Sequence, residues 1–397
     1  MRVVFIEQES QLGGVEYTTL RMAEALDKDR FEPVIICPEE GDLPRLARQA
    51  GLMVRIIPRP KFSSVSVFRN GRYIANLFGF LLTAINVLRA MWNLQKDLRV
   101  HPADIVITKG LLAHFYGGMA ACRLNIPCIW YVQEEVDEKR GAGLFRYILV
   151  KGAQRIPTKI VVDAVALLEQ FGSISALRCT VEVVYNGIDT EQFAPFTLQE
   201  QQIARRNLDI PPSAIVLGQT GRIVPLKGQA TLLQAFAHLV QDFPDIHLIF
   251  VGAALFDSQD YQKKLWSQAA QWHLSDRVHF SGFVPDVRQG LAAMNIFIHA
   301  SVETDSPLGV MEAMSCGLPV VVSSVRGTVE LVTSEVNALV FEPGNSYALA
   351  SALEKLLKSQ QVQKKLSIQA RATVIKKFSL RASVSHLQTI IEEVYDI

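Results

Sequence analysis

The stretch that decides the fold is Ala214-Ile-Val-Leu217-Gly218-Gln-Thr-Gly221-Arg222-Ile-Val-Pro-Leu-Lys227-Gly228. Its apolar start predicts a strand, and apolar residues at helical spacing follow the glycine turn: Ala230, Leu233, Phe236, Ala237 and Val240. A strand, a glycine turn and a helix in this order are typical of a nucleotide site at the carboxyl edge of a parallel sheet. Arg222 and Lys227 would reach one diphosphate from two sides. The alternative is an ordinary turn with solvated charges, and this stretch alone leaves both interpretations open.

The rest of the chain repeats this alternation in two halves. In the first half, apolar runs predict strands at Arg2–Ile6, Pro33–Cys37, Val54–Ile57, Asp104–Thr108, Pro127–Val132, Lys159–Val162 and Val181–Val184. In the second half, they predict strands at Ala214–Leu217, His247–Val251, Val278–Phe280, Ile296–His299 and Pro319–Val322. Helical patterns separate the strands, including one through Leu167 and Leu168. We therefore predict an α/β protein with parallel sheets.

The two halves are expected to be separate domains, because 397 residues exceed the size at which one hydrophobic core keeps growing. The Asn-Gly pair in Tyr185-Asn186-Gly187-Ile188-Asp189 marks a turn at the junction. We predict a first domain over residues 1–188 and a second over residues 189–379. A helix within residues 380–397 is expected to pack back towards the first domain.

Composition excludes several classes of protein. A hydrophobic content of 49% excludes disorder, and a net charge of +1 argues against general nucleic-acid binding. The five cysteines are scattered without CxxC spacing: Cys37, Cys122, Cys128, Cys179 and Cys316. This usage predicts reduced thiols in a cytoplasmic protein and no metal cluster.

One region is strongly basic. Between Arg55 and Arg99 the only acid is Asp97, against eight basic residues: Arg55, Arg59, Lys61, Arg69, Arg72, Arg89, Lys96 and Arg99. Within it, Tyr73–Leu88 is uncharged and apolar, but as a helix of roughly 24 Å it would be too short to span a membrane. Two interpretations remain open: a buried helix with solvated basic flanks, or a surface resting on an anionic leaflet at the inner face of the membrane.

A second informative stretch is Ser301-Val-Glu303-Thr304-Asp305-Ser306-Pro307-Leu308-Gly309-Val-Met-Glu312-Ala-Met-Ser-Cys-Gly317-Leu-Pro319. Ser306 suits an N-cap, Pro307 the first helical position and Gly317 the end of a short helix. The N-terminus of this helix would offer free N–H groups to a phosphate. Glu312 would then accept hydrogen bonds from a ribose beside that phosphate. The alternative for Glu312 is a solvated helix residue.

At this point the chain resembles a known family, the family 4 glycosyltransferases of group 1. The resemblance covers nearly the whole chain and rests on four pieces: Gly13-Gly14-Val15-Glu16, Asn186-Gly187-Ile188-Asp189, Gly221-Arg222…Lys227-Gly228, and Glu312-Ala313-Met314…Gly317-Leu318-Pro319-Val320-Val321. It implies the GT-B fold, in which two Rossmann-like domains face each other across a cleft. It also implies a retaining enzyme with a nucleotide-sugar donor in the second domain and an acceptor in the first.

The resemblance also implies roles for individual residues. Arg222 and Lys227 would hold the diphosphate and neutralise the leaving group, so that neither a metal nor a cofactor is needed. Glu303, Thr304 and Gln133 would act on the sugar. The donor would contact Gly13, Gly14, Gly221, Phe283, Val284, Asp305, Ser306, Pro307, Leu308, Gly309 and Glu312.

The sequence departs from the family pattern in two places. The family has two glutamates seven residues apart, and counting back from Glu312 that position is Thr304, while Glu303 lies one residue early. Either Glu303 shifts into place, or Thr304 and Asp305 share its role. Where the family often has a histidine after the strand Pro127–Val132, this chain has Gln133, which can form hydrogen bonds but cannot titrate.

We therefore expect an enzyme that moves a sugar from a nucleoside diphosphate to a hydroxyl of a saccharide or lipid-linked acceptor. It would be cytoplasmic and peripheral on an anionic membrane, with no nucleic acid among its partners. One alternative is a GT-B-type epimerase; a phosphorylase would need a pyridoxal phosphate lysine, for which no motif is present. The other is a non-catalytic subunit that binds nucleotide sugars, which the altered glutamate spacing favours.

Overall fold

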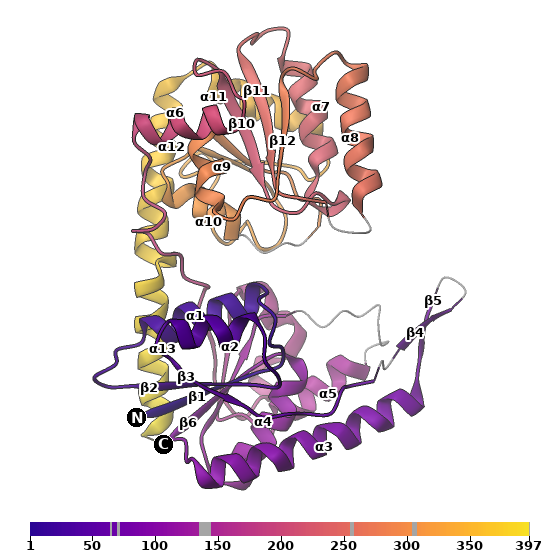
Figure 1. Cartoon of the computed structure of the whole chain (residues 1–397), viewed down its shortest axis with the longest axis vertical. Coiled ribbons are helices and arrows are strands. Elements are labelled where there is room, and N and C mark those ends of the chain that lie inside the picture. Colours follow the sequence, from indigo (N-terminus) through magenta and orange to yellow (C-terminus); the bar gives the residue numbers. More distant parts are fainter. Residues whose placement is uncertain (64–65, 70–71, 135–143, 255–257, 304–307, 397) are drawn as a thin grey trace. The chain divides into compact units, whose positions relative to one another are not determined.

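The computed structural model describes residues 1–63, 66–69, 72–134, 144–254, 258–303 and 308–396. The chain divides into two compact units (Figure 1): unit 1 is Met1–Gly187 with Leu380–Ile397, and unit 2 is Ile188–Ser379. Each unit contains a parallel sheet covered by helices. Within the described residues, no helix combines the length and the hydropathy needed to cross a bilayer.

Unit 1 is built on a seven-stranded sheet in the order β3-β2-β1-β6-β7-β8-β9. Its strands are β1 (Arg2–Glu7), β2 (Glu32–Cys37), β3 (Met53–Ile56), β6 (Ile105–Lys109), β7 (Cys128–Val132), β8 (Lys159–Val162) and β9 (Val181–Val183). One face packs against α1 (Gly14–Ala25), α2 (Asp42–Gln49) and α13 (Leu380–Tyr395). The other packs against α3 (Leu77–Val100), α4 (Leu111–Arg123) and α5 (Leu144–Ala153). Strands buried on both faces explain the continuous apolar runs of the sequence.

Unit 2 is built on a six-stranded sheet in the order β12-β11-β10-β13-β14-β15. Its strands are β10 (Ile215–Thr220), β11 (Ile246–Val251), β12 (Val278–Gly282), β13 (Ile296–His299), β14 (Val320–Ser323) and β15 (Leu339–Phe341). Its helices are α6 (Leu198–Asn207), α7 (Gln229–Leu239), α8 (Gln259–Gln271), α9 (Val287–Ala293), α10 (Leu308–Ser315), α11 (Ser346–Leu357) and α12 (Gln360–Thr373), with short turns η4 (Pro225–Lys227) and η6 (Val374–Phe378).

The predicted strands are confirmed to within a few residues, but two local predictions need correction and one further strand has no prediction. Tyr73 does not begin a helix, because residues 73–75 belong to β5 (Arg72–Ala75), which pairs antiparallel with β4 (Ser66–Arg69). The stretch through Leu167 and Leu168 forms the 3₁₀ helix η2 (Val165–Phe171), followed by a second short turn, η3 (Ile174–Ala176). Strand β15, with only three residues, was not predicted.

Each sheet contains one point at which the strand order reverses. In unit 1 this point lies between β1 and β6, and in unit 2 between β10 and β13. At such a point the loops after the two strands run in opposite directions and leave a crevice outside the carboxyl ends. We therefore expect a site among the residues that follow the strands at these two points, which are β1, β6, β10 and β13.

Candidate active site

In unit 2, glycines allow the loops after β10 and β11 to lie against each other. Gly221 and Gly252 have φ angles of 132° and 141°, and a Cβ on Gly252 would lie 2.0 Å from the carbonyl oxygen of Gly221. Gly228 has a φ of 67°, and a Cβ there would lie 1.9 Å from the carbonyl oxygen of Ala300, just after β13. Only glycine fits at these positions. The loop Gly221–Gly228 is therefore packed against the exits of the neighbouring strands.

Two buried glutamines hold this loop from beneath. The Gln219 side chain donates a hydrogen bond of 2.6 Å to the carbonyl oxygen of Lys227, and the Gln229 side chain donates one of 2.9 Å to that of Arg222. The backbone N–H of Val302 donates to the carbonyl oxygen of Leu226 at 2.9 Å. The backbone positions of both cations are thus fixed by the core. Arg222 itself is exposed, and Lys227 is half-exposed.

Helix α10 begins next to this loop. A Cβ on Gly309 would lie 2.9 Å from the Thr220 hydroxyl, so the first turn of α10 packs closely against the end of β10. The predicted stop at Gly317 is confirmed, since that residue follows α10 with a φ of 76°. Leu308 is the first residue of α10. Thr304, Asp305, Ser306 and Pro307 lie outside the described residues.

Glu312 lies on the second turn of α10 and is half-buried. Burial is the main cause that raises the pKa of its carboxyl group to about 8, and the nearby Asp286 raises it further. Once ionised, this carboxylate is a strong hydrogen-bond acceptor, and a ligand hydroxyl that donates to it would stabilise the ionised form. Partial burial and a raised pKa distinguish Glu312 from a fully solvated helix residue.

The remaining candidates in unit 2 lie on neighbouring strand exits. Phe283 and Val284 follow β12, where Gly282 turns the chain with a φ of 69°, and the side chain of Phe283 is exposed. Glu303 is exposed four residues after the end of β13. Phe283, Val284 and Glu303 thus lie on loops at the same edge of the sheet as Gly221 and Arg222, because all these strands are parallel.

In unit 1, Gly13 and Gly14 form the exposed start of α1. The Glu16 carboxylate accepts a hydrogen bond of 3.0 Å from the backbone N–H of Gly13. A Cβ on Gly14 would meet nothing within 4 Å, so the surface above it is open. These glycines leave space for a ligand at the N-terminus of a 12-residue helix.

Gln133, which follows β7, belongs to a polar network. Its amide nitrogen donates hydrogen bonds of 2.7 Å to the Asn186 side chain and of 3.2 Å to the Thr18 hydroxyl. The Asn186 amide donates to the Asp163 carboxylate at 2.7 Å. Burial raises the pKa of Asp163 to about 6, although its hydrogen bonds and the nearby Lys109 oppose the shift. Gln133 is therefore held in a fixed orientation at the carboxyl edge of the sheet.

Two buried groups of opposite charge lie at the reversal point of unit 1. Glu7 and Lys109 end β1 and β6, occupy paired positions across the two strands, and are 1% and 0% exposed. The Thr19 hydroxyl donates to the Glu7 carboxylate at 2.6 Å, and Lys109 donates to the Thr18 hydroxyl at 3.4 Å. Burial raises the pKa of the Glu7 carboxyl group and lowers the pKa of the Lys109 ammonium group, and the charge of each group opposes the shift of the other.

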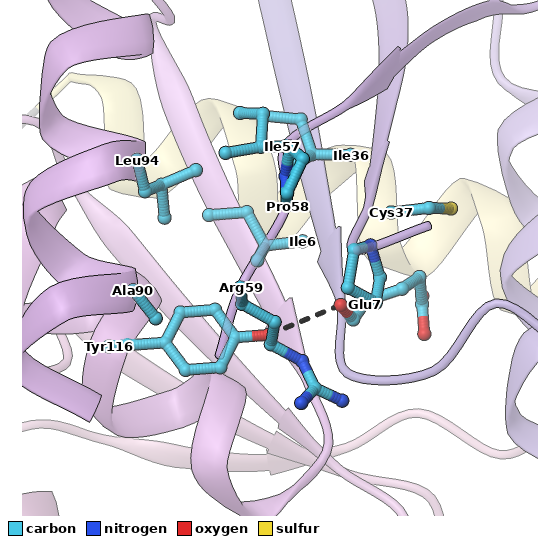
Figure 2. A pocket seen from close by; sticks show the side chains of 11 residues that line it. Ile6, Glu7, Ile36, Cys37, Ile57, Pro58, Arg59, Ala90, Leu94 and Tyr116 are labelled. Carbon is cyan, nitrogen blue, oxygen red and sulfur yellow. Dashed lines mark hydrogen bonds between the residues drawn. The ribbon is translucent and has the colours of Figure 1, made fainter. Parts of the chain in front are cut away.

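A small cavity lies behind Glu7. Its lining includes Arg59, Ile36, Leu94 and Tyr116 (Figure 2). The Tyr116 hydroxyl donates a hydrogen bond of 3.2 Å to the Glu7 carbonyl oxygen. The cavity volume of about 20 Å³ holds no more than one water molecule. This cavity is therefore too small for a sugar.

Both units resemble known families of proteins. Residues 200–373 match the family Glycosyl transferases group 1, and residues 12–192 match Glycosyltransferase Family 4. One match lies in unit 2, and the other covers most of unit 1. The chain is a group 1 glycosyltransferase.

Several relatives of this glycosyltransferase match nearly its full length. It is 21% identical to the UDP-Gal:alpha-D-GlcNAc-diphosphoundecaprenol alpha-1,3-galactosyltransferase of Escherichia coli, over 98% of this chain and 96% of the other. The crystal structure of Anabaena Alr3699/HepE in complex with UDP superposes with a TM-score of 0.82 and 24% identity, over 99% and 100% of the two chains. A glycosyltransferase from Rickettsia africae gives a TM-score of 0.80 at 19% identity, over 99% and 98%. The expected GT-B fold is confirmed by these likenesses.

Sequence reasoning missed several polar residues of this glycosyltransferase: Glu7, Thr18, Lys109, Asp163, Gln219 and Gln229. Glu7, Lys109 and Asp163 each end or follow an apolar strand, which is a readable signal in a parallel sheet. Gln219 is different, because a glutamine inside the apolar run of β10 gives no indication of its hydrogen bond to a backbone carbonyl.

Proposed function

We propose that this glycosyltransferase moves a hexose from a UDP-sugar to a hydroxyl of a lipid-linked saccharide, with retention of configuration and without a metal. The observation that carries the proposal is the fixed loop Gly221–Gly228, which presents Arg222 and Lys227 beside the first turn of α10. The UDP and UDP-glucose complexes of Alr3699/HepE and the UDP-Gal donor of the Escherichia coli relative support this choice of nucleotide.

The two cations would act on the departing diphosphate. When the bond between the anomeric carbon and the diphosphate oxygen breaks, its electron pair leaves with the diphosphate. Arg222 and Lys227 would neutralise the charge that develops there. Since their backbone is already held by Gln219 and Gln229, they need little reorganisation during the reaction.

The sugar and the ribose would be held by residues around this loop. The N–H groups at the start of α10 would bind phosphate, and the ionised Glu312 would accept hydrogen bonds from ribose hydroxyls. Phe283 and Val284 would lie against the base. Glu303, with Thr304 and Asp305, would bind the sugar.

Unit 1 would supply the acceptor side of the reaction. The acceptor hydroxyl would attack the anomeric carbon on the face from which the diphosphate leaves, so the configuration is retained. On this face the hydroxyl can pass its proton to the departing phosphate oxygen. No titrating base is then required at Gln133, whose amide is held by Asn186 and Thr18 and can orient a sugar hydroxyl. The lipid-linked acceptor of the Escherichia coli relative supports a lipid-linked acceptor for this chain.

The proposal is tested by donor turnover with the purified protein. We expect UDP-hexose consumption that persists in EDTA and drops by about 10²-fold or more in Arg222→Ala and in Lys227→Ala, because each removes charge stabilisation from the transition state. The exposed Lys264→Ala, on α8, is the matched control and should retain full activity. Activity lost in EDTA and restored by Mn²⁺ would contradict the metal-independent proposal.

The same assay separates the alternatives. UDP binding without turnover of any UDP-sugar identifies a non-catalytic binding subunit. Conversion of one UDP-sugar into its epimer, with no UDP released, identifies an epimerase. Nuclear magnetic resonance of the new glycosidic bond decides between retention and inversion.

A further inference from the structure

Helix α3 presents apolar side chains on two opposite faces. One face is buried in the core of unit 1 through Val87, Ala90, Met91, Leu94 and Leu98. The other carries Phe78, Leu81, Ile85, Leu88 and Trp92, whose exposed fractions lie between 38% and 71%. These five residues, spaced three or four apart, form one line along the helix, which we call the α3 stripe.

The α3 stripe is large for an exposed apolar surface. At 1.5 Å per residue it runs for about 21 Å along the helix. With side chains of about 150–250 Å² each, these exposures leave roughly 500 Å² of apolar surface in contact with water. Patches of this size on a monomer are often interaction sites.

Positive charge surrounds the α3 stripe. Arg89, Lys96 and Arg99 are exposed on the same helix. Lys61 is exposed beside it, since the Asn86 side chain donates a hydrogen bond of 2.9 Å to the Lys61 carbonyl oxygen. The one acid of α3, Asp97, pairs with Arg55 at 2.7 Å. The neighbouring helix α4 has no acidic residue. The side chains of Arg69 and Arg72 lie outside the described residues.

This combination selects one kind of partner. Phe, Leu and Trp on one helix face, with Lys and Arg beside them, suit the boundary between the acyl chains and the head groups of an anionic bilayer. A second copy of the chain fits poorly, because a symmetric contact would bring the cations of both copies together.

We propose that the α3 stripe, flanked by Lys61, Arg89, Lys96 and Arg99, rests on the surface of an anionic bilayer. Helix α3 then lies along the membrane plane, with the stripe entering the head-group boundary and its opposite face remaining in the core of unit 1. This inference deepens the proposed function. It rests on that function only for the purpose of membrane binding, which is access to a lipid-linked acceptor.

The test is flotation of the full chain with vesicles of phosphatidylcholine, with and without phosphatidylglycerol. We expect binding to the anionic vesicles that weakens from low to high salt, since exposed charges are screened over about 8–10 Å at physiological ionic strength. Leu81→Gln with Trp92→Gln should lower the partition coefficient by about tenfold per side chain. Arg89→Glu with Lys96→Glu should remove the preference for anionic vesicles.

Matched controls lie on helices of unit 2, whereas α3 belongs to unit 1. Ile368→Gln changes an exposed apolar residue of α12, and Lys264→Glu with Lys364→Glu changes two exposed cations, so none of these should alter flotation. A second readout is the emission of Trp92, which should shift to the blue on anionic vesicles and do so no longer in Trp92→Phe. Thermal melting checks that each variant is folded.

Three results would overturn the inference. They are the absence of flotation at any salt concentration, equal binding to neutral and anionic vesicles, and self-association in gel filtration that the Leu81 and Trp92 changes abolish. UDP-induced thermal stabilisation, measured on the same variants, reports on the donor site separately. If the α3 variants keep UDP binding and lose flotation, the membrane surface stands whether or not the proposed transfer reaction does.

Discussion

Replacing Glu312 with glutamine should stabilise the protein while weakening its nucleotide site. Glutamine has nearly the same shape but no charge. The pKa of the Glu312 carboxyl group is raised from 4.5 to about 8. The folded state therefore retains a proton that the unfolded chain has released, and this group lowers stability as pH rises from about 4.5 to about 8.

The size of this effect follows from the shift. At about 1.4 kcal/mol per pKa unit the full shift corresponds to roughly 5 kcal/mol, which we reduce to about 2 kcal/mol because Glu312 is only partly buried. Unit 2 spans residues 188–379, and in a unit of this size 2 kcal/mol is roughly 4–8 °C in melting temperature. We expect Glu312→Gln to gain that amount at pH 8.5 and nothing at pH 4.5.

Nucleotide binding should move in the opposite direction. Because ribose hydroxyls donate to the ionised carboxylate, UDP affinity of the parent should rise between pH 6.5 and pH 8.5, with protons released on binding. Glu312→Gln should lose about 10-fold or more in affinity and lose the pH dependence. Calorimetry in buffers of different ionisation enthalpy measures both. Glu191→Gln, at an exposed position of unit 2, is the control. Equal UDP affinity in parent and Glu312→Gln, or no gain in stability at pH 8.5, would refute this reasoning.

Three further predictions concern other parts of the site. Gln229→Leu removes the hydrogen bond to the carbonyl oxygen of Arg222 and should reduce kcat by about tenfold. It should lower the melting temperature less than a substitution that leaves a cavity in the core, and enzyme kinetics and thermal melting measure the two effects. Lys109→Met leaves Glu7 buried without a compensating charge and should cost about 3–5 kcal/mol in urea unfolding, whereas adding Glu7→Gln should recover most of this; additive losses would contradict the coupling. Glu303→Ala should change the choice among UDP-sugars while UDP affinity stays within about threefold, and an equal loss for both would show that Glu303 does not bind the sugar selectively.

The sequence predicts best the features that depend on residues close together in the chain. The buried parallel strands appear as continuous apolar runs, and the glycine turn of Gly221–Gly228 is required by close backbone contacts that any side chain would block. The β4–β5 hairpin had a local signal too, the Asn70-Gly71 pair in the sequence. The uncharged run Tyr73–Leu88 conceals this signal, because the run continues from β5 into α3 without a change in composition.

The polar network of unit 1 could not be predicted in the same way. Thr18 and Gln133 are 115 residues apart, and they meet only because α1 and the end of β7 lie at the same edge of one sheet. Likewise, the contrast between the two faces of α3 depends on which side packs against the core. Both faces are apolar in the sequence, so hydropathy alone does not tell which face is buried. Only the structure identifies the exposed α3 stripe.

The path of the chain between the units determines the order in which they can be completed during synthesis. The chain leaves unit 1 at Gly187 and returns at Leu380, and a Cβ on Gly187 would lie 2.4 Å from the Cα of Leu380. Leu387, Ile390, Ile391 and Val394 of α13 fill the core of unit 1. On the ribosome, unit 1 therefore lacks one covering helix until all of unit 2 has been made, and its apolar face over β1 and β6 remains open to chaperones during that interval.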